Sequence, residues 1–163
     1  MRTFNVLGLL VGLLLAVSSN DLRAGNEDKK EAVKKDLKQL EGNWQMARQD
    51  HEGREDSGKS IKKNGVLFEG TEYKFLRDGL ATGASATITI DPTKSPKEID
   101  LKITGGTAKG STQLGIYRFT DDGKLEICMN QPRGKGSEKR PAMFTTKPSV
   151  GSGNIMYVLE REK

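Results

Sequence analysis

One stretch decides the fold: Ile99-Asp100-Leu101-Lys102-Ile103, in which apolar and charged residues alternate strictly. Successive side chains of a β-strand point to opposite faces, so this stretch predicts a strand with one face in a core and the other in water. Strands of antiparallel sheets are often half-buried in this way, whereas parallel strands are usually apolar on both faces. We therefore expect an antiparallel sheet.

The chain on both sides of this strand repeats the pattern from Asn43 onward. Short apolar or alternating segments are separated by Gly, Pro, Asp and Asn, which is typical of an antiparallel sandwich or barrel. The predicted strands are 44–49, 66–68, 73–77, 84–90, 98–103, 113–119, 124–130, 142–145 and 154–162. Most connections are short, and two longer, charged loops cover 51–64 and 131–141. We expect a single all-β domain over 43–163, an up-and-down barrel of about eight or nine strands.

One short helix is predicted before the barrel, in a polar region that covers residues 25–42. Residues 27–41 place Val33, Leu37 and Leu40 at helical spacing, with acidic residues at the start and Gly42 after the end. The other faces of this helix carry Lys and Glu. A helix so short and so charged is not stable alone, so we expect its apolar stripe to pack on the barrel.

The first residues have the order of a secretory signal peptide. Arg2 is followed by an apolar run over 6–17, and the sequence becomes polar from Ser18. The run is about a dozen residues long, whereas a membrane-spanning helix needs roughly 20. We expect a signal peptide over 1–24, cleaved between 18 and 24, and a periplasmic or extracellular product. An uncleaved anchor is the alternative.

Charge and composition argue against nucleic acid as a partner. The net charge is +5, and lysines are interspersed with acids along most of the chain. The one dense basic stretch, 133–140, contains Gly and no aromatic residue that would stack on bases. It is predicted to be a solvated loop, with attraction to an anionic surface as the alternative.

Cys128 is the only cysteine, so no internal disulfide stabilises the exported domain. It lies in the strand-like run Leu125-Glu126-Ile127-Cys128-Met129. We expect a buried, inert thiol. The alternatives are an intermolecular bridge and a reactive thiol.

The sequence predicts no catalytic residue, no metal site and no cofactor. His51 is the only histidine, and no other His or Cys lies near it to form a zinc site. No nucleophile-elbow motif is present to supply a serine, and no glycine cluster matches a phosphate-binding loop. The acidic run Asp121-Asp122-Gly123 is too short for a calcium loop.

Two features at the ends of the predicted barrel carry a resemblance. Gly42-Asn43-Trp44 opens the β-region and Arg161 lies in its last strand. This arrangement resembles lipocalin-like (calycin) barrels, in which a Gly-x-Trp closes the barrel floor and a terminal Arg packs across the indole. The resemblance implies a structural role for Gly42, Trp44 and Arg161, because a flat guanidinium stacks on Trp and donates to carbonyl groups.

The chain also resembles a small, often exported domain of unknown function in planctomycete bacteria. The matching pieces include Leu40-Glu41-Gly42-Asn43-Trp44-Gln45, Asp91-Pro92-Thr93-Lys94-Ser95-Pro96-Lys97, Gly115-Ile116-Tyr117, Arg140-Pro141-Ala142-Met143-Phe144 and Val158-Leu159-Glu160-Arg161. That family brings no activity or ligand to this chain.

These observations predict an exported, monomeric, non-catalytic binding module of lipocalin-like type. Its partner would be a small apolar molecule or an envelope protein, with no nucleic acid and no membrane span after cleavage. Alternation assigns the following residues to the barrel interior as ligand-binding candidates: Met46, Tyr73, Phe75, Ile99, Leu101, Ile116 and Tyr157. They fill the core in the alternative, a structural or interaction module of the cell envelope. A hydrolase that uses His51 is the third possibility.

Overall fold

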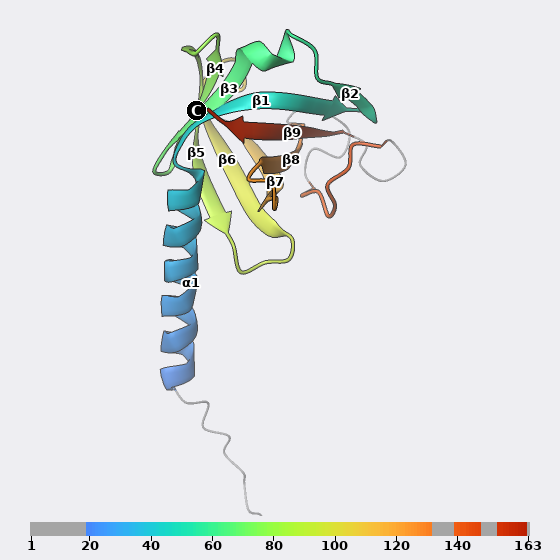
Figure 1. Cartoon of the computed structure of the whole chain (residues 1–163). Helices are drawn as coiled ribbons and strands as arrows, with labels where there is room; N and C mark the ends of the chain where they lie inside the picture. The colour runs from blue at the N-terminus through green and yellow to red at the C-terminus, as the bar shows by residue number, and fades with distance from the viewer. Residues whose placement is uncertain (1–18, 132–138, 148–152, 163) are drawn as a thin grey trace, which may run out of the picture.

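The computed structural model describes residues 19–131, 139–147 and 153–162, and shows one helix followed by a sheet of nine strands (Figure 1). The helix is α1 (Ser19–Leu40), and a 3-10 turn, η1 (Ile61–Lys63), follows the second strand. The strands are β1 (Gly42–His51), β2 (Arg54–Asp56), β3 (Asn64–Glu69), β4 (Glu72–Arg77), β5 (Leu80–Asp91), β6 (Lys97–Gly105), β7 (Thr112–Phe119), β8 (Leu125–Asn130) and β9 (Asn154–Arg161).

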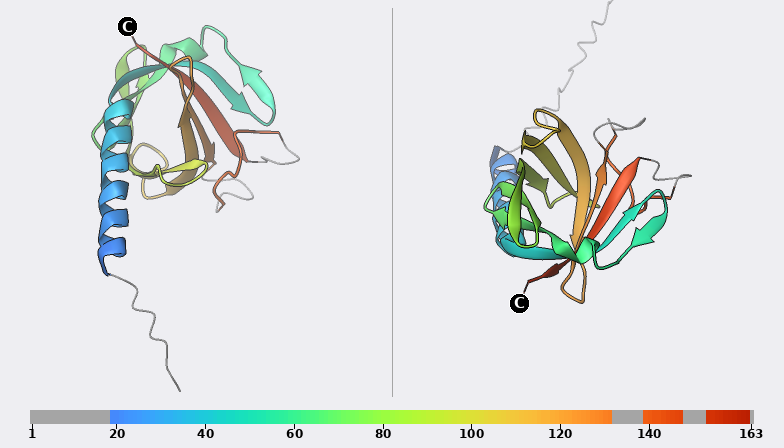
Figure 2. Two further views of the ribbon diagram at one scale, coloured as in Figure 1. Left: turned by 60° about the horizontal axis from the view of Figure 1, so that its bottom comes forward. Right: turned by 90° about the horizontal axis from the view of Figure 1, so that it is seen from above.

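Eight of these strands close into an antiparallel barrel. Each strand from β3 to β9 pairs with the next along the chain, and β1 pairs with both β3 and β9. The view from above shows the resulting ring of strands (Figure 2). The extra strand, β2, folds back as a hairpin onto the end of β1. The predicted all-β, up-and-down barrel with one N-terminal helix is therefore confirmed.

The structure corrects three predicted boundaries. The helix begins at Ser19, eight residues before the predicted start at 27, because no proline interrupts this stretch and its one glycine, Gly25, is tolerated in a helix at about 1 kcal/mol. Residues 142–145 are a bend rather than a strand. The predicted loop over 51–64 contains β2 and η1. Residues 1–18 of the predicted signal peptide lie outside the described residues.

The barrel interior is filled for most of its length. Its largest buried side chains come from β1, β3, β6, β7, β8 and β9, and they include Phe68, Met46, Ile99, Leu101, Tyr117, Leu125, Ile127 and Leu159. Leu40 is fully buried with them, and Val33 and Leu37 pack against the same cluster. The predicted docking of the helix through this stripe is confirmed.

One end of the barrel is closed by α1 and the residues that follow it. The helix lies across this end, and its N-terminal part extends past the barrel (Figure 1). The Trp44 indole donates to the Leu40 carbonyl oxygen at 2.7 Å, and the Arg161 guanidinium lies 4.4 Å above the indole ring. Arg161 also donates to the carbonyl oxygens of Gln39 and Glu41, each at 2.7 Å. One guanidinium thus satisfies carbonyls that the end of the helix leaves free.

A buried carboxylate near the C-terminus of α1 fixes the helix on the same end. Asp36 is only 4% exposed, and its Oδ2 accepts hydrogen bonds from Tyr117 Oη and Lys97 Nζ, both at 2.7 Å. The Lys97 ammonium lies 5.9 Å from the ring centres of Tyr117 and Phe119. Farther along the helix, Lys29 pairs with Asp91 at the end of β5. The helix is therefore held by paired charges as well as by its apolar stripe.

A second, smaller cluster lies on the other face of β7, β8 and β9. It contains Ile116, Cys128 and Met156, and Phe144 packs against it from the bend after β8. The guanidinium of Arg118 lies 4.4 Å from the Phe144 ring centre. The bend is also anchored by Arg140, which donates to the Gly115 carbonyl oxygen at 2.6 Å. The described part of this segment therefore covers the barrel wall.

Replacing Arg161 by Lys is expected to lower the free energy of unfolding by about 1–2 kcal/mol. The ammonium keeps the charge but loses the paired donation to two carbonyl oxygens and part of the contact with the indole. Urea unfolding measures the loss, and Trp44, the only tryptophan, reports the changed environment by its fluorescence.

The matched control is Arg77→Lys, on the exposed part of β4, which should change the unfolding free energy by less than about 0.5 kcal/mol. Equal losses in the two variants would contradict the assigned role of Arg161.

Candidate functional site

The open end of the barrel, opposite α1, contains a hollow of about 180 Å³. Aromatic and aliphatic side chains from β4, β6 and β9 form most of its wall, and small residues of β5 and of the β6–β7 connection form its rim. The lining residues are Tyr73, Phe75, Ala84, Ser85, Leu101, Ile103, Gly105, Gly106, Thr107, Ala108, Gln113 and Tyr157.

Four of the seven residues predicted for a ligand site line this hollow: Tyr73, Phe75, Leu101 and Tyr157. Two others, Met46 and Ile99, are buried in the filled part of the core, at 1% and 0% exposure.

The remaining predicted residue, Ile116, does not face the interior. It belongs to the cluster on the outer face of the barrel, whereas its neighbour Tyr117 belongs to the main core. Both faces of β7 carry large apolar residues, and the segment containing Phe144 covers the outer face. Alternation along β7 was therefore compatible with either face being the inner one, and the prediction assigned the wrong face to the interior.

A second hollow of about 420 Å³ adjoins the first, and the two share Gln113 and Tyr157. Its other lining residues are Gln49, His51, Gln131 and Ile155. His51, which the sequence places in a charged loop, is the last residue of β1 and is half-buried at this opening. Among the described residues, those that line either hollow include no Lys, Arg, Asp or Glu.

The polar side chains that line the first hollow are those of Tyr73, Tyr157, Ser85, Thr107 and Gln113. Burial raises the pKa of Tyr157 to about 12. Burial also raises the pKa of Tyr73, and the neighbouring Tyr157 raises it further. Both phenols therefore remain protonated at ordinary pH and can donate hydrogen bonds. The Tyr73 ring is held edge-on against Phe68, with ring centres 5.4 Å apart.

Sequence reasoning missed the residues that shape the rim. Gly105 and Gly106 look like simple turn residues, yet a Cβ on Gly105 would lie 2.5 Å from the Gly83 carbonyl oxygen, and one on Gly106 would lie 3.3 Å from Ala84. The ends of β5 and β6 approach each other closely here. The register shift between Ser85 and Ala86 that accompanies this approach leaves no clear signal in the sequence.

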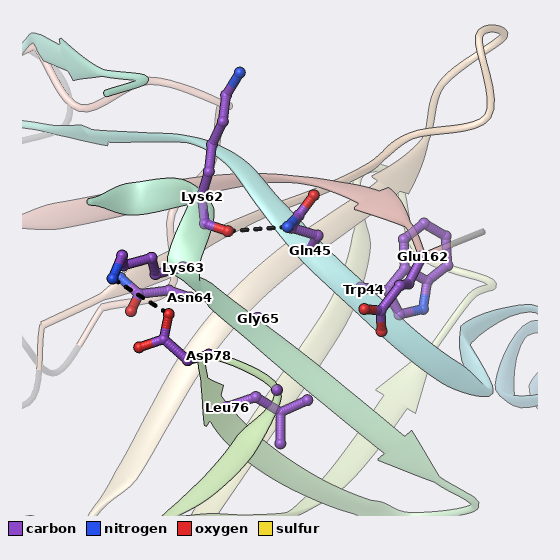
Figure 3. Close-up of a pocket in the computed structure, with 10 residues that line it drawn as sticks. Trp44, Gln45, Lys62, Lys63, Asn64, Gly65, Leu76, Asp78 and Glu162 are labelled. Carbon is purple, nitrogen blue, oxygen red and sulfur yellow. Dashed lines mark hydrogen bonds and ion pairs between the residues drawn. The ribbon is translucent and has the colours of Figure 1, made fainter. Parts of the chain in front are cut away.

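A further hollow of about 270 Å³ lies on the surface beside η1 and the turn between β4 and β5 (Figure 3). Its lysines do not converge on it. Lys63 pairs with Asp78 at 3.5 Å, and the Lys62 side chain extends away while its carbonyl oxygen accepts from Gln45. We therefore place the candidate site at the open end of the barrel.

No family model, curated protein or solved structure is significantly similar to this chain. In the part of the chain that the structure describes, no helix has the length and apolar character needed to span a membrane. No three His, Cys, Asp or Glu side chains of the described residues gather where they could hold a metal ion.

Cys128 is fully buried beneath the bend, with its Sγ 3.8 Å from the Thr145 carbonyl oxygen. Burial raises its pKa from 9.0 to about 11. The folded protein therefore holds the thiol proton more tightly than the unfolded chain does. The corresponding stability is present below about pH 9 and is lost as the pH rises through 11.

We expect the thiol to react with an aromatic disulfide reagent at pH 8 far more slowly in the native protein than in denaturant. We also expect the free energy of unfolding to fall more between pH 8 and pH 10.5 in the wild type than in Cys128→Ala. The loss that remains in Cys128→Ala comes from the other groups that titrate in this range, which include paired lysines as well as the buried tyrosines. Rapid native modification at pH 8, or identical pH profiles, would refute the assignment.

Proposed function

We propose that this chain is an exported, non-catalytic binding module of lipocalin-like type, which holds one small molecule in the open end of its barrel. The observation that carries the proposal is the hollow enclosed by Tyr73, Phe75 and Tyr157. A barrel of eight strands is just wide enough to be filled by side chains or to hold one small ligand. In this barrel side chains fill most of the interior, and the hollow lies at the open end.

Binding rather than catalysis is supported by what surrounds His51. The described residues that share its hollow carry amide, phenol and aliphatic groups, which orient or enclose a ligand. None of these described residues carries a carboxylate to orient the imidazole, or a thiol or aliphatic hydroxyl for it to activate as a nucleophile. In this proposal His51 is therefore part of the rim of a binding site.

The filled core supports a second candidate, an interaction or structural module of the cell envelope. Six of the seven predicted interior residues belong to the main core cluster or pack against it, and the hollow is small. Such a module would use the surface at the open end; residues 133–138 of the basic stretch 133–140 lie outside the described part. This candidate predicts that no small molecule enters the barrel.

A four-compound titration separates these two candidates. We expect at least one of 1-hexanol, p-cresol, dodecanoate and glucose to shift the amide resonances of the lining residues of the wild type in ¹H–¹⁵N NMR spectra. Ala108→Leu fills the hollow and should abolish those shifts, and Ala84→Leu repeats the test should the first variant not fold. The matched control is Ala81→Leu, at an exposed position of β5 outside the lining, which should bind as the wild type does.

Absence of shifts with all four compounds would refute the small-molecule proposal and favour the filled-core module. Equal shifts in Ala108→Leu and in the wild type would refute the assigned location.

The export part of the proposal has its own test. When the full-length chain is expressed in a Gram-negative host, we expect the periplasmic fraction to contain a protein that begins between residues 19 and 25. Mass spectrometry of the intact protein and of its N-terminal peptide measures this start. Recovery of the chain only in the cytoplasm, or with residues 1–18 still attached, would contradict a cleaved signal peptide.

A further inference from the structure

The size of the hollow limits the molecules that it can hold. Its volume is about 180 Å³. An apolar cavity of about 150 Å³ in a protein core binds benzene, whereas sites for drug-sized ligands span about 300–1,000 Å³. The hollow therefore has room for one or two fused rings, whereas a long acyl chain would extend beyond it, out of its opening or into the adjoining hollow.

The limits of this space are set by groups that do not move easily. Leu101 is 2% exposed and belongs to the main core, so the hollow cannot deepen without disturbing that core. The rim cannot widen beside Gly105 without breaking the pairing of β5 with β6, in which Gly105 is the partner of Ser85. The size of the hollow is thus a property of the fold.

The wall favours a flat ring over a flexible aliphatic chain. Tyr73, Phe75 and Tyr157 present aromatic rings to the hollow, while Leu101 and Ile103 contribute aliphatic side chains. Aromatic pairs in offset or edge-to-face geometry gain about 0.5–1.5 kcal/mol beyond the burial of their area. A ligand ring gains this contribution, whereas a flexible chain loses conformational freedom as it becomes ordered.

The electrostatics of the hollow favour a neutral ligand. No cationic residue lines it within the described part of the chain, and burial keeps both phenols protonated. An ionised carboxylate would lose its water without gaining an opposite charge, which is strongly unfavourable. A single polar group on the ligand, in contrast, could accept a hydrogen bond from Tyr157 or bond with the amide of Gln113.

We propose that the open end of the barrel selects a neutral aromatic molecule of one or two rings that carries one hydrogen-bonding group. This inference rests on the proposed binding function and names the class of its ligand. The ring occupies the space between Tyr73, Phe75 and Tyr157. The polar group of the ligand points toward Tyr157 and Gln113, which both hollows share.

Paired probes that differ in one property test this assignment on the full-length chain. Dissociation constants are measured by NMR titration for p-cresol, for p-toluate as its charged relative, for 1-hexanol as an alcohol without a ring, and for toluene as a ring without a hydroxyl. We expect p-toluate and 1-hexanol to bind at least about ten-fold more weakly than p-cresol, a difference of about 1.4 kcal/mol.

The variant Tyr157→Phe tests the hydrogen bond while it keeps the ring. It should weaken p-cresol binding by about three- to ten-fold, the usual effect of one lost hydrogen bond, and should leave toluene binding unchanged. Toluene therefore serves as an internal control for the fold of the variant. An equal loss for both ligands would overturn the assignment of the polar group.

The outcomes distinguish this inference from the function on which it rests. If 1-hexanol or p-toluate binds in the hollow as tightly as p-cresol, the ligand class is wrong and the binding function stands. If none of these probes binds but dodecanoate or glucose shifts the lining residues, the class again fails alone. If no compound of either set shifts those residues, the inference and the proposed function both fail.

Discussion

The contact of Arg161 with Trp44 and with the end of α1 is the one on which the closed end of the barrel depends. A single guanidinium stacks on the indole and donates to the carbonyl oxygens of Gln39 and Glu41. It thereby joins the last strand to the helix and the first strand, which lie at the other end of the sequence. Since a helix leaves its final carbonyl groups without partners inside the helix, this end needs donors if it is to pack against a barrel.

The buried Asp36 makes the position of the helix specific. An apolar stripe alone would allow the helix to shift slightly along the barrel. A buried carboxylate without a partner, in contrast, is strongly destabilising, by about 3–5 kcal/mol where one partner of a buried pair has been removed. Only one register of α1 places Asp36 beside both Lys97 and Tyr117. With one end sealed in a single register, the space open to a ligand lies at the other end, where the β6–β7 connection and the end of β1 form the rim.

The sequence predicted what depends on local pattern, and it missed what depends on partners far along the chain. The alternation in β6, the stripe of Val33, Leu37 and Leu40, and the barrel class all follow from local periodicity. Asp36 looks like one more acid on a charged helix, and its burial becomes evident only when Lys97 and Tyr117 are brought to it. The prediction that Ile116 faces the barrel interior was wrong for a related reason. Its strand carries large apolar residues on both faces, so periodicity could not show which face was inside. The candidate site was predictable where aromatic residues alternate in β4, and unpredictable at Gln113 and at the glycine rim.

The packing of the core and the size of the hollow depend on the same side chains. Leu101 belongs to both, since it is buried in the main cluster and lines the hollow. Truncating such a leucine to widen the space costs about 2–5 kcal/mol, and a small domain has only about 5–15 kcal/mol of stability in total. The domain has no disulfide to offset that loss, because Cys128 is its only cysteine. The depth of the hollow is therefore limited by the stability of the barrel, which is why the ligand class follows from the packing of the core rather than from the residues of the rim alone.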